Sequence, residues 1–240
     1  MKIAMKKKAG AEMKLIYNGK TKDVYALEDG NILLRFKDDV TGENGVFDPG
    51  ANTVGLKIEG AGKSGLRFTS TMFKILADEG VKTHMISADI DKAEMIVHPI
   101  TQLVGKGLEA ICRFRAVGSF WRRYAPILRE EGQPLDAIVE FTLKDDERGD
   151  PPISGDSLVS LGIVTADEIE YLKAATRKIA VCLKGFLAKK GLELYDMKVE
   201  FGRDAGGDIL LIDEISAGCL RAYRDGEFIM PLELDKIIFS

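Results

Sequence analysis

Short runs of hydrophobic residues bounded by polar residues recur along the first hundred positions, and such runs are typical of β-strands. The strands predicted in this part cover residues 13–18, 23–28, 31–37, 82–87 and 93–97, and a further short strand is considered over 53–58. Asp29-Gly30 lies between two of these strands and predicts a hairpin turn. Residues 42–65 are rich in glycine, asparagine and aspartate, so we predict that most of this stretch is loop.

The period of an α-helix first appears over residues 67–79. Phe68, Met72 and Leu76 recur at a spacing of four, which places them on one helix face. Gly80 follows directly, and glycine is the residue most often found just past a helix end. We therefore predict one amphipathic helix in the first half of the chain.

The second half begins with strands and contains the strongest helix. Strands are predicted over residues 109–115, 137–143, 192–201 and 208–215, with a short helix after Gly118. Thr165 and Glu168 have the spacing of a capping box at the start of a helix over residues 165–190. Because strands come in runs and do not alternate strictly with helices, the pattern favours an α+β fold with mainly antiparallel sheets.

Three parts of the chain are predicted. Residues 1–14 form a basic N-terminal tail, residues 15–104 an N-terminal lobe, and residues 105–240 a larger C-terminal lobe. The chain has 240 residues, which is enough for one large domain or two small lobes.

Charge and composition narrow the range of partners. Thirty-four basic and 38 acidic residues give a net charge of −4, which argues against a protein that coats nucleic acid. The longest stretch without a charged residue, Met95–Gly105, is about half the length that a membrane span needs. Cys112, Cys182 and Cys219 are far apart and form no Cys-x-x-Cys motif. We expect reduced thiols, a cytoplasmic location, and neither a nucleic-acid nor a membrane partner.

The most informative segment is an acidic hairpin near the C-terminus. Asp196 and Glu200 share one face of the predicted strand over residues 192–201. If Gly206-Gly207 forms a two-residue type I′ turn, Glu200 lies directly opposite Asp213. Facing carboxylates repel each other, and a bound Mg²⁺ would reverse the sign of that interaction. A solvated acidic face without metal is the alternative interpretation.

Two further segments have residues suited to phosphate. Asn18-Gly19-Lys20-Thr21-Lys22 combines a turn with two lysines that can surround a polyphosphate, although an ordinary charged hairpin turn has the same composition. Arg113 and Arg115 share a strand face, and Gly118-Ser119 then opens a predicted helix, whose N–H groups can bind an anion. This second segment predicts a site for a phosphate monoester, with solvated arginines as the alternative.

Gly60-Ala-Gly-Lys-Ser-Gly65 matches the glycine pattern of a dinucleotide site, but the acidic residue expected about 20 positions later is absent. The same stretch resembles the end of a P-loop, with Lys57 in place of the first glycine. A dinucleotide-binding oxidoreductase and a non-catalytic nucleotide-binding module are therefore the alternative functions. Protection by NAD without ATP would favour the former, and ATP binding without turnover the latter.

Taken together and in order, these segments resemble the SAICAR synthetase family of purine biosynthesis, from about Leu15 to Tyr223. The stretches that carry the resemblance are Tyr17-Asn-Gly-Lys-Thr-Lys-Asp-Val-Tyr25, Arg113 to Ser119, Lys144-Asp-Asp-Glu-Arg-Gly-Asp150-Pro151, Asp196-Met-Lys-Val-Glu-Phe-Gly-Arg203 and Asp213-Glu-Ile-Ser216 with Arg221. The spacing between the Asp-x-Lys-x-Glu-Phe-Gly and Asp-Glu-Ile-Ser motifs is specific to this family.

The resemblance implies an ATP-dependent ligase with ATP and Mg²⁺ as cofactors. Members join the carboxylate of carboxyaminoimidazole ribonucleotide (CAIR) to the amine of L-aspartate through an acyl phosphate, and they release SAICAR, ADP and phosphate. The implied fold has two α+β lobes with ATP between them, distantly similar to ATP-grasp and kinase lobes. We expect a homo-oligomer, with a dimer as the first choice, acting on small molecules.

The resemblance also implies roles for individual residues. The residues implied for ATP are Gly19, Lys20 and Lys22 at the phosphates, and Val97, His98 and Ile100 beside adenine. Glu200 and Asp213 match the magnesium ligands. The residues implied for substrate are Arg113, Ser119, Lys198 and Arg221 at the nucleotide, with Lys144, Asp150, Asp39 and Thr41 in substrate loops. Those implied for catalysis are Lys20, Lys198 and Asp150, and either Asp150 or Asp39 would accept the proton of the aspartate amine.

Three segments depart from the family pattern. Many members have Ser-Pro-Asp before the final arginine, whereas this chain has Ser216-Ala-Gly-Cys-Leu-Arg221. Glu43 occupies a position that is usually glycine, and residues 55–65 form an enlarged segment.

Overall fold

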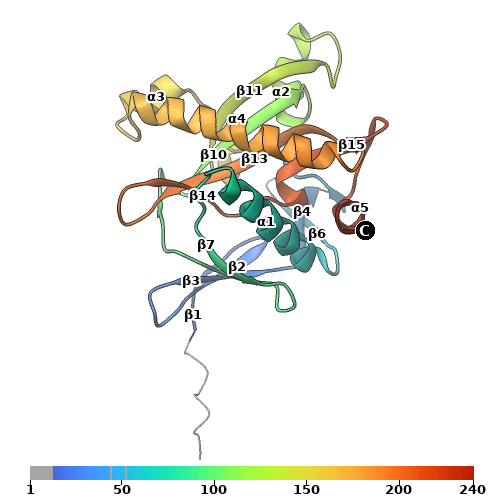
Figure 1. Ribbon diagram of the computed structural model, residues 1–240. Coiled ribbons are helices and arrows are strands. Elements are labelled where there is room, and N and C mark those ends of the chain that lie inside the picture. Colours follow the sequence, from blue (N-terminus) through green and yellow to red (C-terminus); the bar gives the residue numbers. More distant parts are fainter. Residues whose placement is uncertain (1–12, 44, 52) are drawn as a thin grey trace, which may run out of the picture.

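The computed structural model describes residues 13–43, 45–51 and 53–240 (Figure 1). Most of the predicted tail, residues 1–12, lies outside the described residues. The strands are β1 Lys14–Asn18, β2 Lys22–Ala26, β3 Ile32–Phe36, β4 Asp39–Glu43, β5 Val46–Phe47, β6 Val54–Lys57, β7 Met85–Asp89, β8 Glu94–Val97, β9 Thr101–Gln102, β10 Leu108–Arg115, β11 Pro134–Leu143, β12 Pro152–Ile153, β13 Glu193–Arg203, β14 Ile209–Ile212, β15 Leu220–Arg224 and β16 Glu227–Phe228. The helices are α1 Ala61–Asp78, α2 Gly118–Tyr124, α3 Gly155–Ser160, α4 Ala166–Ala188 and α5 Pro231–Phe239, with 3₁₀ turns η1 Ala125–Ile127, η2 Asp146–Arg148 and η3 Ala217–Cys219.

Within the described residues, the N-terminal strands form a sheet in the order β1-β2-β3-β8-β7, with antiparallel neighbours. The predicted turn at Asp29-Gly30 is confirmed, and Gly30 has a φ of 85°, which glycine adopts at little cost. One face of this sheet buries Leu34, Phe36 and Met95 against Leu66 of α1. Strands β4, β5 and β6 form a smaller sheet of their own.

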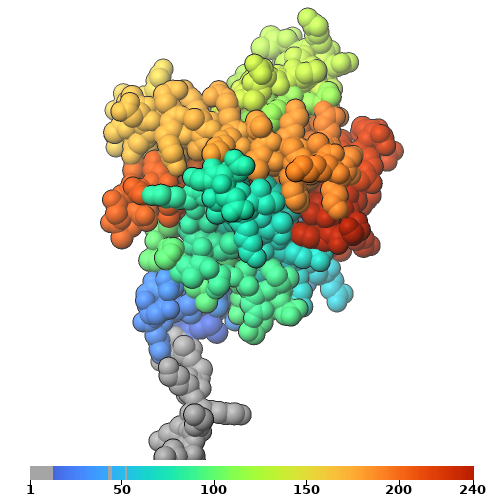
Figure 2. All heavy atoms as spheres, viewed as in Figure 1, coloured from blue at the N-terminus to red at the C-terminus, as the bar shows by residue number. Residues whose placement is uncertain are grey.

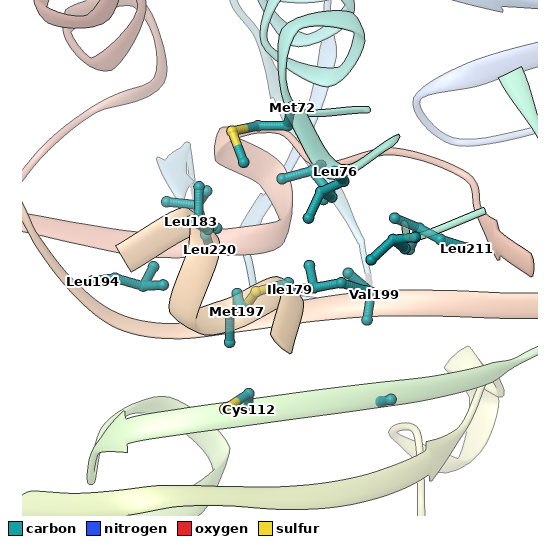
Figure 3. Packing of buried hydrophobic residues seen from close by; sticks show 14 of the residues in the cluster. Met72, Leu76, Cys112, Ile179, Leu183, Leu194, Met197, Val199, Leu211 and Leu220 are labelled. Atoms are coloured by element: carbon teal, nitrogen blue, oxygen red, sulfur yellow. The ribbon is translucent and has the colours of Figure 1, made fainter. Parts of the chain in front are cut away.

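The C-terminal sheet follows the order β12-β11-β10-β13-β15-β16, and β9 and β14 also pair with β13. Helix α4 lies along one face of this sheet, with α1 beside it (Figure 1). In Figure 3, Met72 and Leu76 of α1 meet Ile179 and Leu183 of α4 above β13. The space-filling view shows α4 in orange and α1 in teal as one continuous outer surface (Figure 2). The main hydrophobic core therefore lies between these two helices and the C-terminal sheet.

The prediction that residues 42–65 are mostly loop is wrong. Strands β4 and β5 were missed, and α1 begins at Ala61, six residues before the predicted start. The reason lies in Gly62, where a Cβ atom would come within 2.9 Å of the carbonyl oxygens of Phe36 and Lys37. The glycines of this stretch permit a close approach of α1 to the end of β3, so their number does not signal an irregular chain.

Helix α4 confirms its prediction down to the cap. Thr165 Oγ1 accepts the N–H of Glu168 at 3.2 Å, and Glu168 Oε2 accepts the N–H of Thr165 at 2.7 Å. The Glu168 carboxylate also accepts a hydrogen bond from Arg203 at the end of β13. The hydrogen bonds from Arg203 and Thr165 lower the pKa of Glu168 to about 2.

The register predicted for the acidic hairpin is wrong by one residue. Glu200 pairs with Ile212, and the turn has three central residues instead of two. The N–H of Gly207 bonds to the carbonyl of Asp204, and Gly207 alone of the two glycines has a positive φ, 89°. A type I turn followed by a left-handed glycine is the usual three-residue hairpin loop, and the extra residue shifts the pairing.

The α+β class with mainly antiparallel sheets is confirmed. The division between lobes at residues 104 and 105 stays a prediction. Helix α1, from the predicted N-terminal lobe, contributes Leu66 to the core of the N-terminal sheet and Phe68 to the main core. Elements β9, β12, α3, β15, β16 and α5 were not predicted.

Candidate active site

Three neighbouring strands of the C-terminal sheet carry the polar side chains of the site. Across β11, β10 and β13 the register aligns Thr142 with Glu109 and Glu200, Glu140 with Ile111 and Lys198, and Arg113 with Asp196. Because side chains alternate along a strand, the intervening residues, such as Ala110 and Val199, point into the core under α4. One face of the sheet is thus apolar, and the other is charged although largely buried.

A cavity of about 650 Å³ is lined by this polar face and by the N-terminal sheet. Its lining includes these predicted site residues: Gly19, Lys20, Lys22, Asp39, Thr41, Val97, His98, Ile100, Lys144, Asp150, Lys198, Glu200 and Asp213. Residues that are far apart in the sequence therefore meet around one space large enough for a nucleotide.

Glu200 and Asp213 reach this cavity together although they are not paired across the hairpin. Strand β14 ends at Ile212, and Asp213 then adopts a left-handed φ of 63°, which redirects the chain. Asp213 Oδ1 lies 3.0 Å from Lys22 Nζ, and Glu200 Oε1 lies 2.5 Å from Lys144 Nζ. Burial and the charge of Asp213 raise the pKa of Glu200. Burial alone would also raise the pKa of Asp213, but Lys22 and Lys144 outweigh it and lower that pKa.

Lys22 is buried and pairs with both Asp213 and Glu214. Burial would lower the pKa of Lys22, but the charges of the two acids outweigh it and raise the pKa. Sequence reasoning missed Glu214 as a site residue, because its partner lies 192 residues earlier. Lys20, in the turn after β1, has its Nζ 2.5 Å from Asp146 Oδ1 in η2.

A second cavity of about 380 Å³ adjoins the first. The residues common to both linings are Pro49, Glu109, Asp150, Lys198 and Cys219. Arg113, Ser119 and Arg221, all predicted for the nucleotide substrate, line the second cavity. Arg115, which shared a predicted face with Arg113, does not line it: a β-bulge lies between them, and Arg115 pairs with Glu193 at 2.6 Å.

The arginines of the second cavity are tightly held. Arg113 is 1% exposed, and its Nη1 donates to Asp196 at 2.7 Å while its Nη2 donates to Ser119 Oγ at 2.8 Å. Arg221 donates to the same Asp196 carboxylate at 2.9 Å. Gly118 explains the close packing, because a Cβ there would come within 2.8 Å of the Arg221 guanidinium.

Lys198 lies where the two cavities join. Its Nζ is 2.7 Å from Glu109 Oε1, and Glu109 Oε2 accepts a hydrogen bond from Thr142 at 2.7 Å. Asp150 has a φ of 49°, and its Oδ1 accepts the N–H of Asp145 at 2.7 Å. Burial and the charge of Glu109 raise the pKa of Asp150. Glu109 and Thr142 were not predicted, but their alternation with apolar core residues on adjoining strands was available as a signal.

The remaining predicted residues lie at the side of the first cavity formed by the N-terminal strands. Thr41 Oγ1 donates to the carbonyl of Asp48 at 3.0 Å, and Asp39 Oδ2 lies 4.0 Å from Lys37 Nζ. The N–H of His98 donates to the carbonyl of His84 at 2.8 Å. Burial lowers the pKa of His84 to about 4, so this side chain is neutral at pH 7.

These features define a class: an α+β enzyme in which a nucleotide-sized cavity, lined by lysines and buried carboxylates, adjoins a second, arginine-lined cavity. The family model for SAICAR synthetase matches residues 15–239. The chain therefore belongs to the SAICAR synthetase family.

Curated relatives and solved structures agree. A phosphoribosylaminoimidazole-succinocarboxamide synthase from Clostridium tetani is 58% identical over 95% of this chain and 100% of that protein. The crystal structure of the synthase from Ehrlichia chaffeensis is 30% identical, with a TM-score of 0.79 over 90% of this chain and 88% of the other. A SAICAR synthetase in complex with ADP is 32% identical, with a TM-score of 0.77 over 95% of this chain and 90% of that one. No helix in the described part of the chain is long and apolar enough to cross a membrane.

Proposed function

We propose that the two joined cavities catalyse the ATP-dependent ligation of CAIR and L-aspartate to SAICAR, with release of ADP and phosphate. The observation that carries this proposal is the junction at Lys198, Glu109 and Asp150, where the lysine–carboxylate cavity meets the arginine cavity. ATP would occupy the first cavity and the nucleotide substrate the second, so that the γ-phosphoryl group and the substrate carboxylate meet at the junction.

On the ATP side, Gly19 and Lys20 would contact the phosphates, and residues 97–100 would border adenine. The similar SAICAR synthetase in complex with ADP supports nucleotide binding by this chain. Lys22 was predicted to contact the ATP phosphates, but its ammonium group is already paired with Asp213 and Glu214. Its role would be to hold the two acids in place as well as to face the phosphates.

The residues present fit a magnesium ion. Glu200 and Asp213 are carboxylates at one cavity wall, and the raised pKa of Glu200 reflects burial together with the charge of Asp213. The described residues contain no cluster of three or more histidine, cysteine, aspartate or glutamate side chains of metal-binding geometry. Mg²⁺ commonly binds through one or two carboxylates plus substrate phosphates, so two acids suffice. When bound, the ion would neutralise charge on the phosphoryl group in transfer.

The chemistry requires activation of a carboxylate. Direct amide formation would expel oxide, so one CAIR carboxylate oxygen instead attacks the γ-phosphorus of ATP, which gives an acyl phosphate and ADP. The aspartate nitrogen then attacks the acyl carbon, and phosphate leaves with the bridging oxygen. This division of one difficult step into two easier ones is the logic of covalent activation. Lys20 and Lys144 would stabilise negative charge in the first step.

The second cavity would hold the ribonucleotide through Arg113, Ser119 and Arg221, with Lys198 at the junction. The aspartate amine must lose a proton, and Asp150 is the proposed acceptor. Its pKa is raised by burial and by Glu109, which makes the carboxylate a stronger base than a solvated aspartate. Asp39, the other predicted acceptor, and Thr41 line the first cavity and would contact L-aspartate.

The alternative functions gain no support from the glycine segment. Gly60 is the left-handed N-cap of α1, and the N–H of Gly62 donates to Asp38 Oδ1 at 3.0 Å. These glycines position a helix against β3, so neither the dinucleotide-binding nor the P-loop interpretation is needed to explain them.

We also propose a cytoplasmic homo-oligomer, in the first instance a dimer. Light scattering on the purified chain would measure the oligomeric state.

The test is a coupled ADP-release assay with ATP, CAIR and L-aspartate, each omitted in turn. We expect ADP and SAICAR to form together only in the complete mixture. ADP release at the same rate with and without CAIR would overturn the proposal. Binding of ATP, CAIR and L-aspartate without turnover would also overturn it and would favour a nucleotide-binding module. Protection by ATP in thermal denaturation would show that the preparation is folded. A lack of turnover in such a preparation would then count against the assignment.

A further inference from the structure

The basic residues that line the second cavity are not electrically equivalent. Six side chains form an alternating ion-pair network, which runs Asp48, Arg221, Asp196, Arg113, Glu140 and Arg123 with contacts of 2.5 to 2.9 Å. Three guanidinium groups thus face three carboxylates, and the formal charges cancel. Lys198 is likewise paired with Glu109.

Arg122 is the exception. It lines the same cavity and is exposed, and the described part of the chain offers its side chain no hydrogen bond or ion pair. Burial raises the pKa of Asp48, but the Gly50 N–H, the Arg221 contacts and, last, the charge of Arg122 outweigh it and lower that pKa. Arg122 therefore lies near the network without joining it. Among the basic side chains that line this cavity in the described structure, Arg122 is therefore the one without a carboxylate partner. Asp150, which also lines the cavity, has no ion pair with any described residue either.

Two further atoms point to a missing acceptor. Ser119 Oγ accepts a hydrogen bond from Arg113, so its own hydrogen remains available to donate. Arg123 Nε is buried without a hydrogen-bond partner in the described structure. Buried donors are normally satisfied, so this N–H is an unused donor on a residue that lines the cavity.

We propose that Arg122 supplies the unpaired positive charge that binds the phosphate monoester of the nucleotide substrate, whereas Arg113 and Arg221 are already paired with carboxylates and offer hydrogen bonds. This inference rests on the proposed function, because it presumes that a phosphorylated nucleotide enters the second cavity. A guanidinium binds phosphate through charge-assisted, often bidentate hydrogen bonds, and one that no carboxylate neutralises keeps its full charge for that contact.

The test compares Arg122→Gln with Arg129→Gln, an equal charge change at an exposed residue outside both cavities. We expect Arg122→Gln to weaken calorimetric binding of ribose 5-phosphate about tenfold, as for one charge-assisted hydrogen bond, and to raise KM for CAIR similarly. KM for ATP and for aspartate should stay within about twofold of the wild-type values. Arg122→Lys should recover part of the loss, and Arg129→Gln should match the wild type throughout.

Equal binding of ribose 5-phosphate by the wild type and Arg122→Gln would overturn the inference and leave the proposed function standing. Failure of the wild type to turn over CAIR would overturn the proposed function, and ribose 5-phosphate binding would still decide the role of Arg122. A loss of affinity for unphosphorylated ribose in Arg122→Gln would also count against it, since the inference assigns this residue to the phosphate alone.

Discussion

At the scale of single residues, the site depends on close contacts between groups that are distant in the sequence. Glu214 and Asp196, both buried, act through partners on other strands, Lys22 and Arg113. The family motifs gave the lining residues that this chain would use, and the alternation along the strand predicted over residues 192–201 indicated a charged face. Neither could give the ion-pair partners, because these depend on strand order and register.

Gly118 provides one test at this scale. Gly118→Ala would strain a backbone with φ of 56° and place a Cβ within 2.8 Å of the Arg221 guanidinium. We expect KM for CAIR to rise about tenfold or more, with KM for ATP little changed, because only the second cavity is disturbed. Gly30→Ala is the matched control, since Gly30 has a φ of 85° but nothing within 4 Å of the added carbon. If KM for CAIR is the same in Gly118→Ala and Gly30→Ala, the contact with Arg221 does not affect substrate binding and the prediction is wrong.

The carboxylate pair gives a second test. Glu200→Gln and Asp213→Asn each remove one negative charge beside a lysine, and we expect kcat to fall about 10²-fold or more, a typical loss for one electrostatic group. The Mg²⁺ concentration for half-maximal rate should also rise in each variant. Rates measured over a Mg²⁺ titration check this, and a wild-type titration curve in either variant would remove these acids from the metal site.

At the scale of elements, patterning predicted the long, strongly periodic segments and failed at turns and close approaches. Helix α4 was predicted with its cap, because Thr165 and Glu168 act locally. The hairpin register failed, because Gly206-Gly207 fits two loop types that differ by one residue. The start of α1 failed, because Gly62 is required by contact with β3, which no local pattern reveals.

The cap of α4 gives an element-scale prediction with a pH dependence. The pKa of Glu168 is lowered to about 2, so its contribution to stability is present above the unfolded value of about 4.3 and is lost as pH falls toward 2. Glu168→Gln should therefore destabilise the protein at pH 7, and the difference from the wild type should shrink below about pH 4. Urea denaturation at several pH values measures this. Glu170→Gln, in an exposed pair with Lys173, is the control and should have little effect.

At the scale of the whole molecule, Lys22 ties the N-terminal sheet to the segment after β14. Lys22→Met would leave Asp213 and Glu214 buried without this cation, and we expect a loss of about 3 kcal/mol in the free energy of unfolding at pH 7. Lys82→Met is the matched control, because its pair with Asp208 is more than half exposed on both sides. Equal stability of the two variants in denaturant titrations would mean that Lys22 does not join the two parts.

The account as a whole states that ATP in one cavity activates the carboxylate of a nucleotide in the other. Its most direct test uses CAIR labelled with ¹⁸O in both carboxylate oxygens, turned over with ATP and L-aspartate. An acyl phosphate transfers its bridging oxygen to the leaving group, so mass spectrometry should find one ¹⁸O in each inorganic phosphate released. The other labelled oxygen should remain in the amide of the product. Inorganic phosphate without ¹⁸O, formed together with the amide, would contradict the account.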